Sequence, residues 1–173
     1  MSKPDNHEPN AHSAFDYSAA VITVSDKGSR GERADTSGPA IRGMLEGEGW
    51  QVKRSAIVSD EPEEIKKELI ACADGLGVDL ILTTGGTGFS RRDNTPEATE
   101  AVIDRAVPGI PEAMRAESMR VTPMGMLSRA TAGLRGNCLI INLPGSEKAA
   151  GECLAAVLPV LKHAIKMIQG GGH

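Results

Sequence analysis

The fold of this chain is decided by residues 78–97, which read VDLILTTGGTGFSRRDNTPE. The opening apolar run of branched side chains is typical of a strand buried in a sheet. The closing Thr95-Pro96-Glu97 combines a hydroxyl, a proline and an acid, as the first turn of a helix often does. A glycine-rich loop between such a strand and helix directs backbone N–H groups toward one point. The stretch therefore predicts a loop that binds a phosphate, with an acidic end suited to a cation.

The glycine spacing does not by itself identify a ligand. No lysine follows the glycines, as a P-loop requires, and the third glycine of a dinucleotide fingerprint is missing after Gly86-Thr87-Gly88. A plain turn between strand and helix is therefore the alternative interpretation. Asp93 can likewise be a turn residue. Asp60, three residues before Glu63, can be part of a helix cap.

Composition excludes several classes of protein. The 173 residues suit one domain, which we expect at 18–170 between a disordered tail at 1–17 and a short tail at 171–173. A net charge of −4 and few aromatic residues argue against a nucleic-acid surface. No apolar run suggests a membrane span or a signal peptide. Three cysteines without close spacing favour buried, reduced thiols, so we expect a cytoplasmic protein.

Apolar patterns predict strands that alternate with helices along the chain. Strands are expected at 19–24, 51–58 and 78–82, with a hairpin at 132–135 and 138–143. Helices are expected from about 37 to 47, from 62 to 73, and at 95–106, 110–119 and 147–168, with a possible short helix within 122–129. This order predicts an α/β three-layer sandwich, with a mainly parallel sheet, a small hairpin and helices on both faces. Polar loops that follow the strands should meet at the carboxyl edge of the sheet.

Three motifs in order resemble one known family. They are Ser25-Asp26, the stretch LTTGGTGFSRRDNTPEAT at 82–99, and INLPG at 141–145. Together they are similar to the molybdopterin adenylyltransferases, which belong to the molybdenum cofactor biosynthesis proteins and include a domain of gephyrin. The resemblance spans about residues 19–169 and extends to Met126-Leu127-Ser128-Arg129.

The resemblance implies an enzyme that transfers AMP from Mg-ATP to the phosphate of molybdopterin and releases pyrophosphate. It implies Mg²⁺ as cofactor, a homo-oligomer with a trimer favoured over a hexamer, and a molybdate insertase as a partner. Asp60 and Asp93 match the two aspartates of the family's site, as catalytic residues and Mg²⁺ ligands. Substrate- or phosphate-binding positions are implied at Ser25, Asp26, Thr84, Gly85, Gly86, Thr87, Gly88, Arg92, Ser128, Gly145 and Ser146.

The implied chemistry suits these residue types. A phosphate nucleophile is already anionic near neutral pH, so positioning and charge neutralisation are sufficient without an activating Ser, Cys or His. The sequence departs from many family members at Arg91 and Glu147, where they have proline. The main alternative is a non-catalytic molybdopterin-binding or scaffold protein of the same fold. An insertase needs further domains, the related competence-damage-inducible domain has a different glycine loop, and a P-loop kinase needs a lysine.

Overall fold

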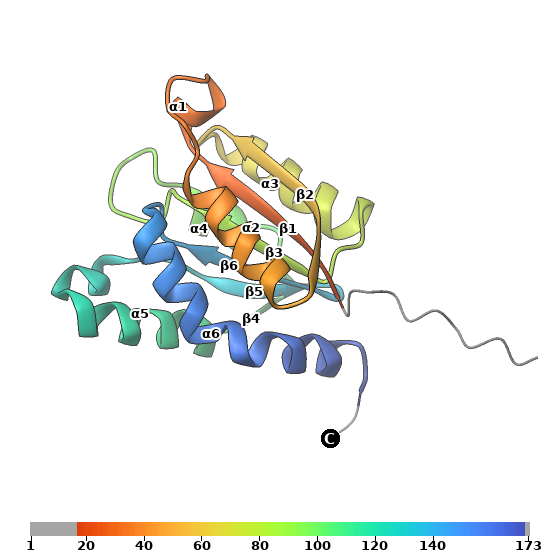
Figure 1. Ribbon diagram of the computed structural model, residues 1–173. Coiled ribbons are helices and arrows are strands. Elements are labelled where there is room, and N and C mark those ends of the chain that lie inside the picture. Colours follow the sequence, from red (N-terminus) through yellow and green to blue (C-terminus); the bar gives the residue numbers. More distant parts are fainter. Residues whose placement is uncertain (1–16, 172–173) are drawn as a thin grey trace, which may run out of the picture.

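The computed structural model describes residues 17–171, which form one six-stranded sheet with helices on both faces (Figure 1). The strand order is β2-β1-β3-β6-β5-β4. The strands are β1 (Tyr17–Val24), β2 (Trp50–Val58), β3 (Leu80–Thr84), β4 (Arg105–Ala106), β5 (Ala132–Arg135) and β6 (Cys138–Leu143). The pairs among β2, β1, β3 and β6 are parallel, and β4 and β5 complete the sheet in antiparallel pairs. The predicted α/β fold with a mainly parallel sheet is confirmed. β1 begins one residue before the predicted start of the domain, and the predicted tails at 1–16 and 172–173 lie outside the described residues.

Side chains of the central strands alternate between two cores, one on each face of the sheet. Val21 and Leu82 belong to the core covered by helices α2 (Ser37–Gly47), α5 (Gly109–Val121) and α6 (Glu147–Ile168). Ile22 and Ile81 belong to the core covered by α3 (Pro62–Ile70) and α4 (Thr95–Glu100). Strands buried on both faces carry continuous apolar runs, which is why these segments were recognisable from sequence.

The remaining helical segments are short. They are α1 (Asp26–Ser29), a π-helical turn η1 (Ala71–Gly75) that continues α3, and a 3-10 helix η2 (Pro123–Leu127) in the segment where a short helix was expected.

Pro159 lies inside α6, which changes direction along its length in Figure 1. No helix within residues 17–171 combines the length and apolar character that a membrane span requires. All three cysteines are free and buried, and burial raises the pKa of Cys72 and of Cys138 to about 12.

The prediction of one helix over 95–106 is wrong. Helix α4 ends at Glu100, and the chain then forms the edge strand β4. The Asp104 backbone N–H donates to the Leu134 carbonyl (2.6 Å), so a partner distant in sequence takes up this backbone. Gly133 makes the pairing possible, since a Cβ there would lie 2.7 Å from the Arg105 carbonyl oxygen. The predicted hairpin is thus the inner part of a three-stranded antiparallel unit.

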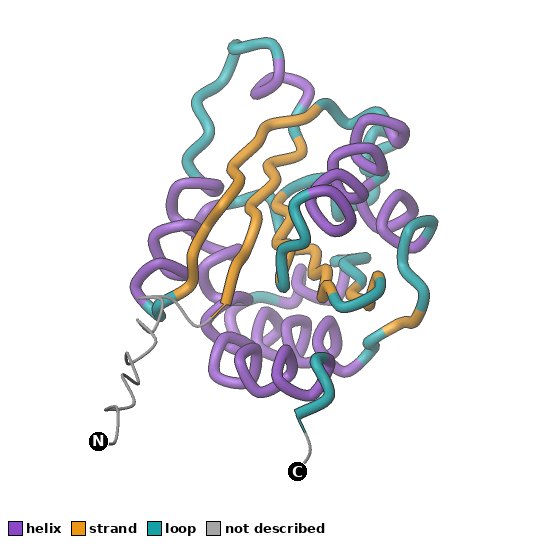
Figure 2. Tube along the Cα trace, turned by 90° about the vertical axis from the view of Figure 1, so that its right-hand side faces the viewer, coloured by secondary structure: helices purple, strands orange, loops and turns teal. Residues whose placement is uncertain are grey.

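Four strands end together at one edge of the sheet. The register pairs Val24 with Val58, Thr23 with Thr84, and Thr84 with Leu143. The polar loops that begin after these strands therefore leave from the same edge, as the alternating pattern predicted. In Figure 2 the chain after β1, including α1, projects beyond the ends of the long strands before it returns to α2. This edge is where the candidate site lies.

Candidate functional site

A cavity of about 430 Å³ lies at the carboxyl edge of the sheet, a size suited to a small-molecule ligand. Loops after β1, β2, β3 and β6 all contribute to its walls. The lining residues are Thr23, Val24, Ser25, Gly28, Arg33, Ala34, Asp35, Thr36, Ser37, Asp60, Thr84, Gly85, Gly86, Asp93, Gly145, Ser146 and Glu147. The structure thus brings together residues that are as much as 124 positions apart in sequence, Thr23 and Glu147.

The glycine loop after β3 needs its first two glycines for backbone reasons. Gly85 has φ +102° and Gly86 has φ +67°, conformations that residues with a Cβ rarely adopt. A Cβ on Gly86 would also collide with the Thr95 hydroxyl, which donates to the Gly85 carbonyl (2.8 Å). The Thr95 backbone N–H in turn donates to the Gly86 carbonyl (3.1 Å). The loop is therefore held against the start of α4, with its backbone open to the cavity.

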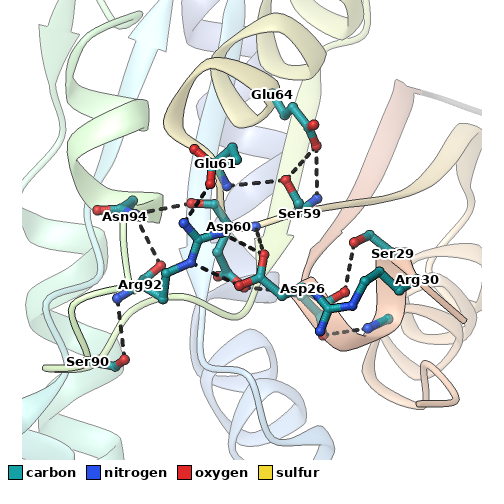
Figure 3. Close-up of polar contacts among 12 residues, drawn as sticks. Asp26, Ser29, Arg30, Ser59, Asp60, Glu61, Glu64, Ser90, Arg92 and Asn94 are labelled. Carbon is teal, nitrogen blue, oxygen red and sulfur yellow. Dashed lines mark hydrogen bonds and ion pairs between the residues drawn. The ribbon is translucent and has the colours of Figure 1, made fainter. Parts of the chain in front are cut away.

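Asp26 and Asp60 join two of the loops through reciprocal hydrogen bonds (Figure 3). The Asp26 backbone N–H donates to Asp60 Oδ2 (2.8 Å), and the Asp60 backbone N–H donates to Asp26 Oδ1 (2.9 Å). Helix α3 is capped at Glu61, without a side-chain hydrogen bond. The alternative interpretation of Asp60 as a helix cap is therefore wrong, because its carboxylate is bonded to the loop after β1 instead.

Arg92 pairs with two acids beside the cavity (Figure 3). Its Nε and Nη2 donate to the two carboxylate oxygens of Asp26 (3.0 and 2.9 Å), and its Nη1 donates to Glu61 Oε1 (2.6 Å). The bidentate contact with Arg92, followed by the hydrogen bond from the Asp60 backbone, lowers the pKa of Asp26. Arg92 lies outside the cavity lining, so contact with a phosphate would require these bonds to be exchanged.

The pKa of Asp60 is shifted in the opposite direction to that of Asp26. Burial raises the pKa of Asp60, and the neighbouring carboxylates of Asp26 and Asp93 add to the increase. The hydrogen bond from the Asp26 backbone and the charge of Arg92 act in the other direction. A carboxylate that is partly desolvated and close to other acids gains from a positive charge brought by a ligand.

Asp93 combines a turn contact with a place in the cavity wall. Its Oδ2 accepts from the Ser90 backbone N–H (2.9 Å), which confirms the turn interpretation. Its backbone carbonyl accepts from Arg129 Nη2 (2.8 Å). Arg129 also donates through Nε to the Gly88 carbonyl (2.8 Å) and pairs with Glu97. Arg129 thus holds the loop between β3 and α4 in shape, a role that sequence reasoning did not assign to it.

The structure brings most of the predicted site residues together. Those in the cavity wall are Ser25, Asp60, Thr84, Gly85, Gly86, Asp93, Gly145 and Ser146; those outside it are Asp26, Thr87, Gly88, Arg92 and Ser128. Ser128 lines a different cavity of about 390 Å³, together with Arg115 and Arg129. Of the two departures from the family pattern, Arg91 is exposed outside the cavity, whereas Glu147 lines it.

Sequence reasoning missed the wall formed by residues 33–37. Asp35 accepts from the Thr23 hydroxyl (2.7 Å) and from the Gly38 backbone N–H (3.0 Å), which fixes the start of α2 to β1. The Ser37 hydroxyl donates to the Gly145 carbonyl (2.8 Å) and so ties α2 to the loop before α6. The sequence did contain one signal, because the polar loop after the first strand is unusually long. Such a length indicates a functional loop but does not say which of its residues line the site.

The donor atoms of this cavity suit a hard cation that is shared with a ligand. Within residues 17–171, no group of three or more His, Cys, Asp or Glu side chains is placed to hold a metal ion by itself. Asp60 and Asp93 both face the cavity, and each uses one carboxylate oxygen, Oδ2, for a backbone hydrogen bond. Magnesium commonly takes one or two carboxylates and completes its shell with substrate phosphates and water. The residues present fit Mg²⁺ bound together with a phosphate ligand.

Comparison with known proteins identifies the family. Residues 20–163 match the family model described as a probable molybdopterin binding domain, and the chain belongs to this family. It is 43% identical over 152 residues to the molybdopterin adenylyltransferase of Helicobacter pylori (strain ATCC 700392 / 26695), covering 87% of this chain and 86% of that protein.

Two further comparisons agree with this assignment. The crystal structure of the molybdopterin biosynthesis enzyme MoaB from Thermus thermophilus superposes with a TM-score of 0.85 at 55% identity, covering 89% of this chain and 97% of that one. Gephyrin from Dictyostelium discoideum is 40% identical over 172 residues, which cover 94% of this chain and 24% of gephyrin. Both the predicted family resemblance and the predicted relation to gephyrin are confirmed.

Proposed function

We propose that this chain is a molybdopterin adenylyltransferase of molybdenum cofactor biosynthesis, which transfers AMP from ATP to the phosphate of molybdopterin and releases pyrophosphate. The observation that carries the proposal is a cavity in which the glycine loop meets Asp60 and Asp93. The chain is also 43% identical, over most of its length, to an enzyme of that name. An oxygen of the molybdopterin phosphate attacks the α-phosphorus of ATP, and the bond to pyrophosphate breaks.

The cavity offers backbone and helix dipoles to the phosphates. The long helix α6 begins at the cavity, where Ser146 is its N-cap, and α2 begins there at Ser37. Helix N-termini carry partial positive charge and free N–H groups, which favour anions. Gly85 and Gly86 present backbone to the same space without side chains in between. These groups hold the reacting phosphates in place, which is the main requirement of phosphoryl and nucleotidyl transfer.

Asp60 and Asp93 have the proposed role of holding Mg-ATP. Bound Mg²⁺ supplies neutralisation of the charge on the triphosphate. The raised pKa of Asp60 supports this role, because its carboxylate is stabilised when a cation arrives. Asp26 does not line the cavity, and its proposed role is to orient Asp60 through their reciprocal hydrogen bonds.

The proposal also includes the location, the assembly and the partner of the protein. We expect a cytoplasmic homo-oligomer, a trimer rather than a hexamer, that delivers adenylylated molybdopterin to a molybdate insertase. The non-catalytic alternative would keep the cavity and bind molybdopterin without turnover. The named enzymes among the relatives support the catalytic role over this alternative.

The proposal is tested by pyrophosphate release from Mg-ATP with and without molybdopterin. Asp60→Asn and Asp93→Asn should each reduce molybdopterin-dependent release at least about 100-fold, because each removes a charge that positions the nucleotide. Asp104→Asn is the control, since Asp104 lies outside the cavity and accepts a hydrogen bond from the Gly136 backbone that an amide can also accept. Release that is absent in the folded wild type, with molybdopterin still bound, would favour the binding-only alternative.

A further inference from the structure

The cavity wall has an uneven charge balance. Four of its side chains are carboxylic acids, Asp35, Asp60, Asp93 and Glu147, and only one side chain of the described lining is a basic group, Arg33. A triphosphate or a phosphate monoester brings further negative charge into this space. Binding such a ligand therefore needs positive charge from a cation, from helix dipoles or from a side chain that can reach it.

Two arginines beside the glycine loop, Arg92 and Arg129, are already engaged. Arg92 uses Nε, Nη1 and Nη2 on Asp26 and Glu61. Arg129 pairs with Glu97 and also donates to the carbonyls of Gly88 and Asp93. Releasing either guanidinium toward a phosphate would break several charge-assisted bonds and loosen the loops that form the site. Neither is a ready ligand for an anion.

Arg33 is in the opposite situation. It is exposed, and within residues 17–171 no hydrogen bond or ion pair joins its guanidinium to another side chain or to the backbone. The charged side chains on either side of it in the loop are committed elsewhere, with Arg30 paired to Glu32 and Asp35 bonded to Thr23. The guanidinium is thus available to bond a ligand in the cavity whose wall includes Arg33.

The backbone that carries Arg33 is fixed at both ends. Before it, the Glu32 N–H donates to the Lys27 carbonyl (2.9 Å), and Ser25 caps the short helix α1 by accepting from Gly28 (3.0 Å). After it, the two hydrogen bonds accepted by Asp35 anchor the start of α2. This segment returns from the projecting part of the chain, seen in Figure 2, to the edge of the sheet. Among the residues that the structure describes, Arg33 is therefore an unpaired side chain on an anchored loop that lines the cavity.

We propose that Arg33 binds a phosphate group of the substrate, whereas Arg92 stays paired with Asp26 and Glu61. The proposal about Arg33 rests on the proposed function only in the identity of the ligand. A guanidinium can donate two parallel hydrogen bonds to phosphate oxygens, which a lysine cannot reproduce. The phosphate can come from the triphosphate of ATP or from molybdopterin, because both are expected in the same cavity.

The test compares Arg33→Gln with Arg91→Gln by titration calorimetry and by steady-state kinetics. Arg91 is also an exposed arginine without an ion pair among the described residues, but it lies outside the cavity. Binding of Mg-ATP, inorganic pyrophosphate and molybdopterin is measured separately on the full chain. We expect Arg33→Gln to weaken at least one of them about tenfold, to raise the corresponding KM with little change in kcat, and to lose this effect at high salt. Arg33→Lys should restore part of the affinity.

The outcomes separate the role of Arg33 from the proposed enzymatic function. A rise in the KM for ATP assigns Arg33 to the triphosphate, and a rise in the KM for molybdopterin assigns it to that phosphate; either result supports the inference. Equal affinities for all three ligands in Arg33→Gln and Arg91→Gln would overturn it. If the wild type releases no pyrophosphate but Arg33→Gln still binds ATP more weakly, then the enzymatic function fails while the role of Arg33 stands.

Discussion

A buried amide beneath the glycine loop provides the sharpest stability prediction. Asn142 lies in the central strand β6 and is fully buried. Its side-chain N–H₂ donates to the hydroxyls of Thr83 (3.0 Å) in β3 and Thr99 (2.9 Å) in α4. Its Oδ1 accepts from the Thr131 backbone N–H (3.2 Å). This one side chain ties α4, and with it the loop from Gly85 to Asp93, to the sheet.

Asn142→Ala should destabilise the fold by about 3 kcal/mol. Three hydrogen bonds are lost at about 1 kcal/mol each, because the buried hydroxyls of Thr83 and Thr99 lose a donor and the Thr131 backbone N–H loses its acceptor. For a domain of this size the change corresponds to a fall in Tm of about 6–12 °C. Asn137→Ala is the matched control, because Asn137 is exposed in the turn between β5 and β6 and should change stability by less than about 0.5 kcal/mol.

The assay is equilibrium urea denaturation at a fixed protein concentration, combined with a double-mutant cycle. Thr99→Val removes one acceptor of the same network, so the double variant with Asn142→Ala should cost less than the sum of the single variants by about 1 kcal/mol. A cost below about 1 kcal/mol for Asn142→Ala, or strict additivity in the cycle, would refute the reasoning. Activity should fall along with stability, because the glycine loop loses its support.

The remaining predictions concern the edge of the cavity. Gly86→Ala should lower both stability and pyrophosphate release, whereas Gly136→Ala, also at positive φ but with open space around it, should lower only stability. Arg92→Gln should destabilise the fold at neutral pH, and denaturation curves should converge with the wild type as pH falls below 3.8, because the lowered pKa of Asp26 contributes stability only while that group is ionised. Asp60→Asn should raise stability at neutral pH, since the raised pKa of Asp60 makes its ionised form costly, while pyrophosphate release falls as predicted above; a less stable variant at neutral pH, with equal stability in acid, would contradict this.

The sequence by itself determined the elements whose signals are local. The apolar runs of the central strands, the glycines of the loop and the Pro-containing start of α4 each fall within a few consecutive residues, and the structure confirms them. The order of strands and helices was sufficient to predict that polar loops meet at the carboxyl edge of a parallel sheet. Asp93 and Gly145 could be named in advance because they stand in family motifs that are read along the chain, and Asp60 because it matches an aspartate of the family's site.

Only the tertiary structure decided what depends on partners distant in sequence. The segment after Glu100 has a helical pattern, but its backbone pairs with β5, which the local sequence does not reveal. Arg92 meets Asp26 across 66 positions, so its charge is already neutralised in the fold although its place in the motif suggested a phosphate ligand. Arg33 belongs to none of the family motifs, and its proposed role follows from its place in the cavity wall and from the lack of an ion pair among the described residues. Local propensity and hydrophobic pattern determine the helices and strands. The ion pairs that form in the folded chain determine which charged side chains remain available to bind a ligand.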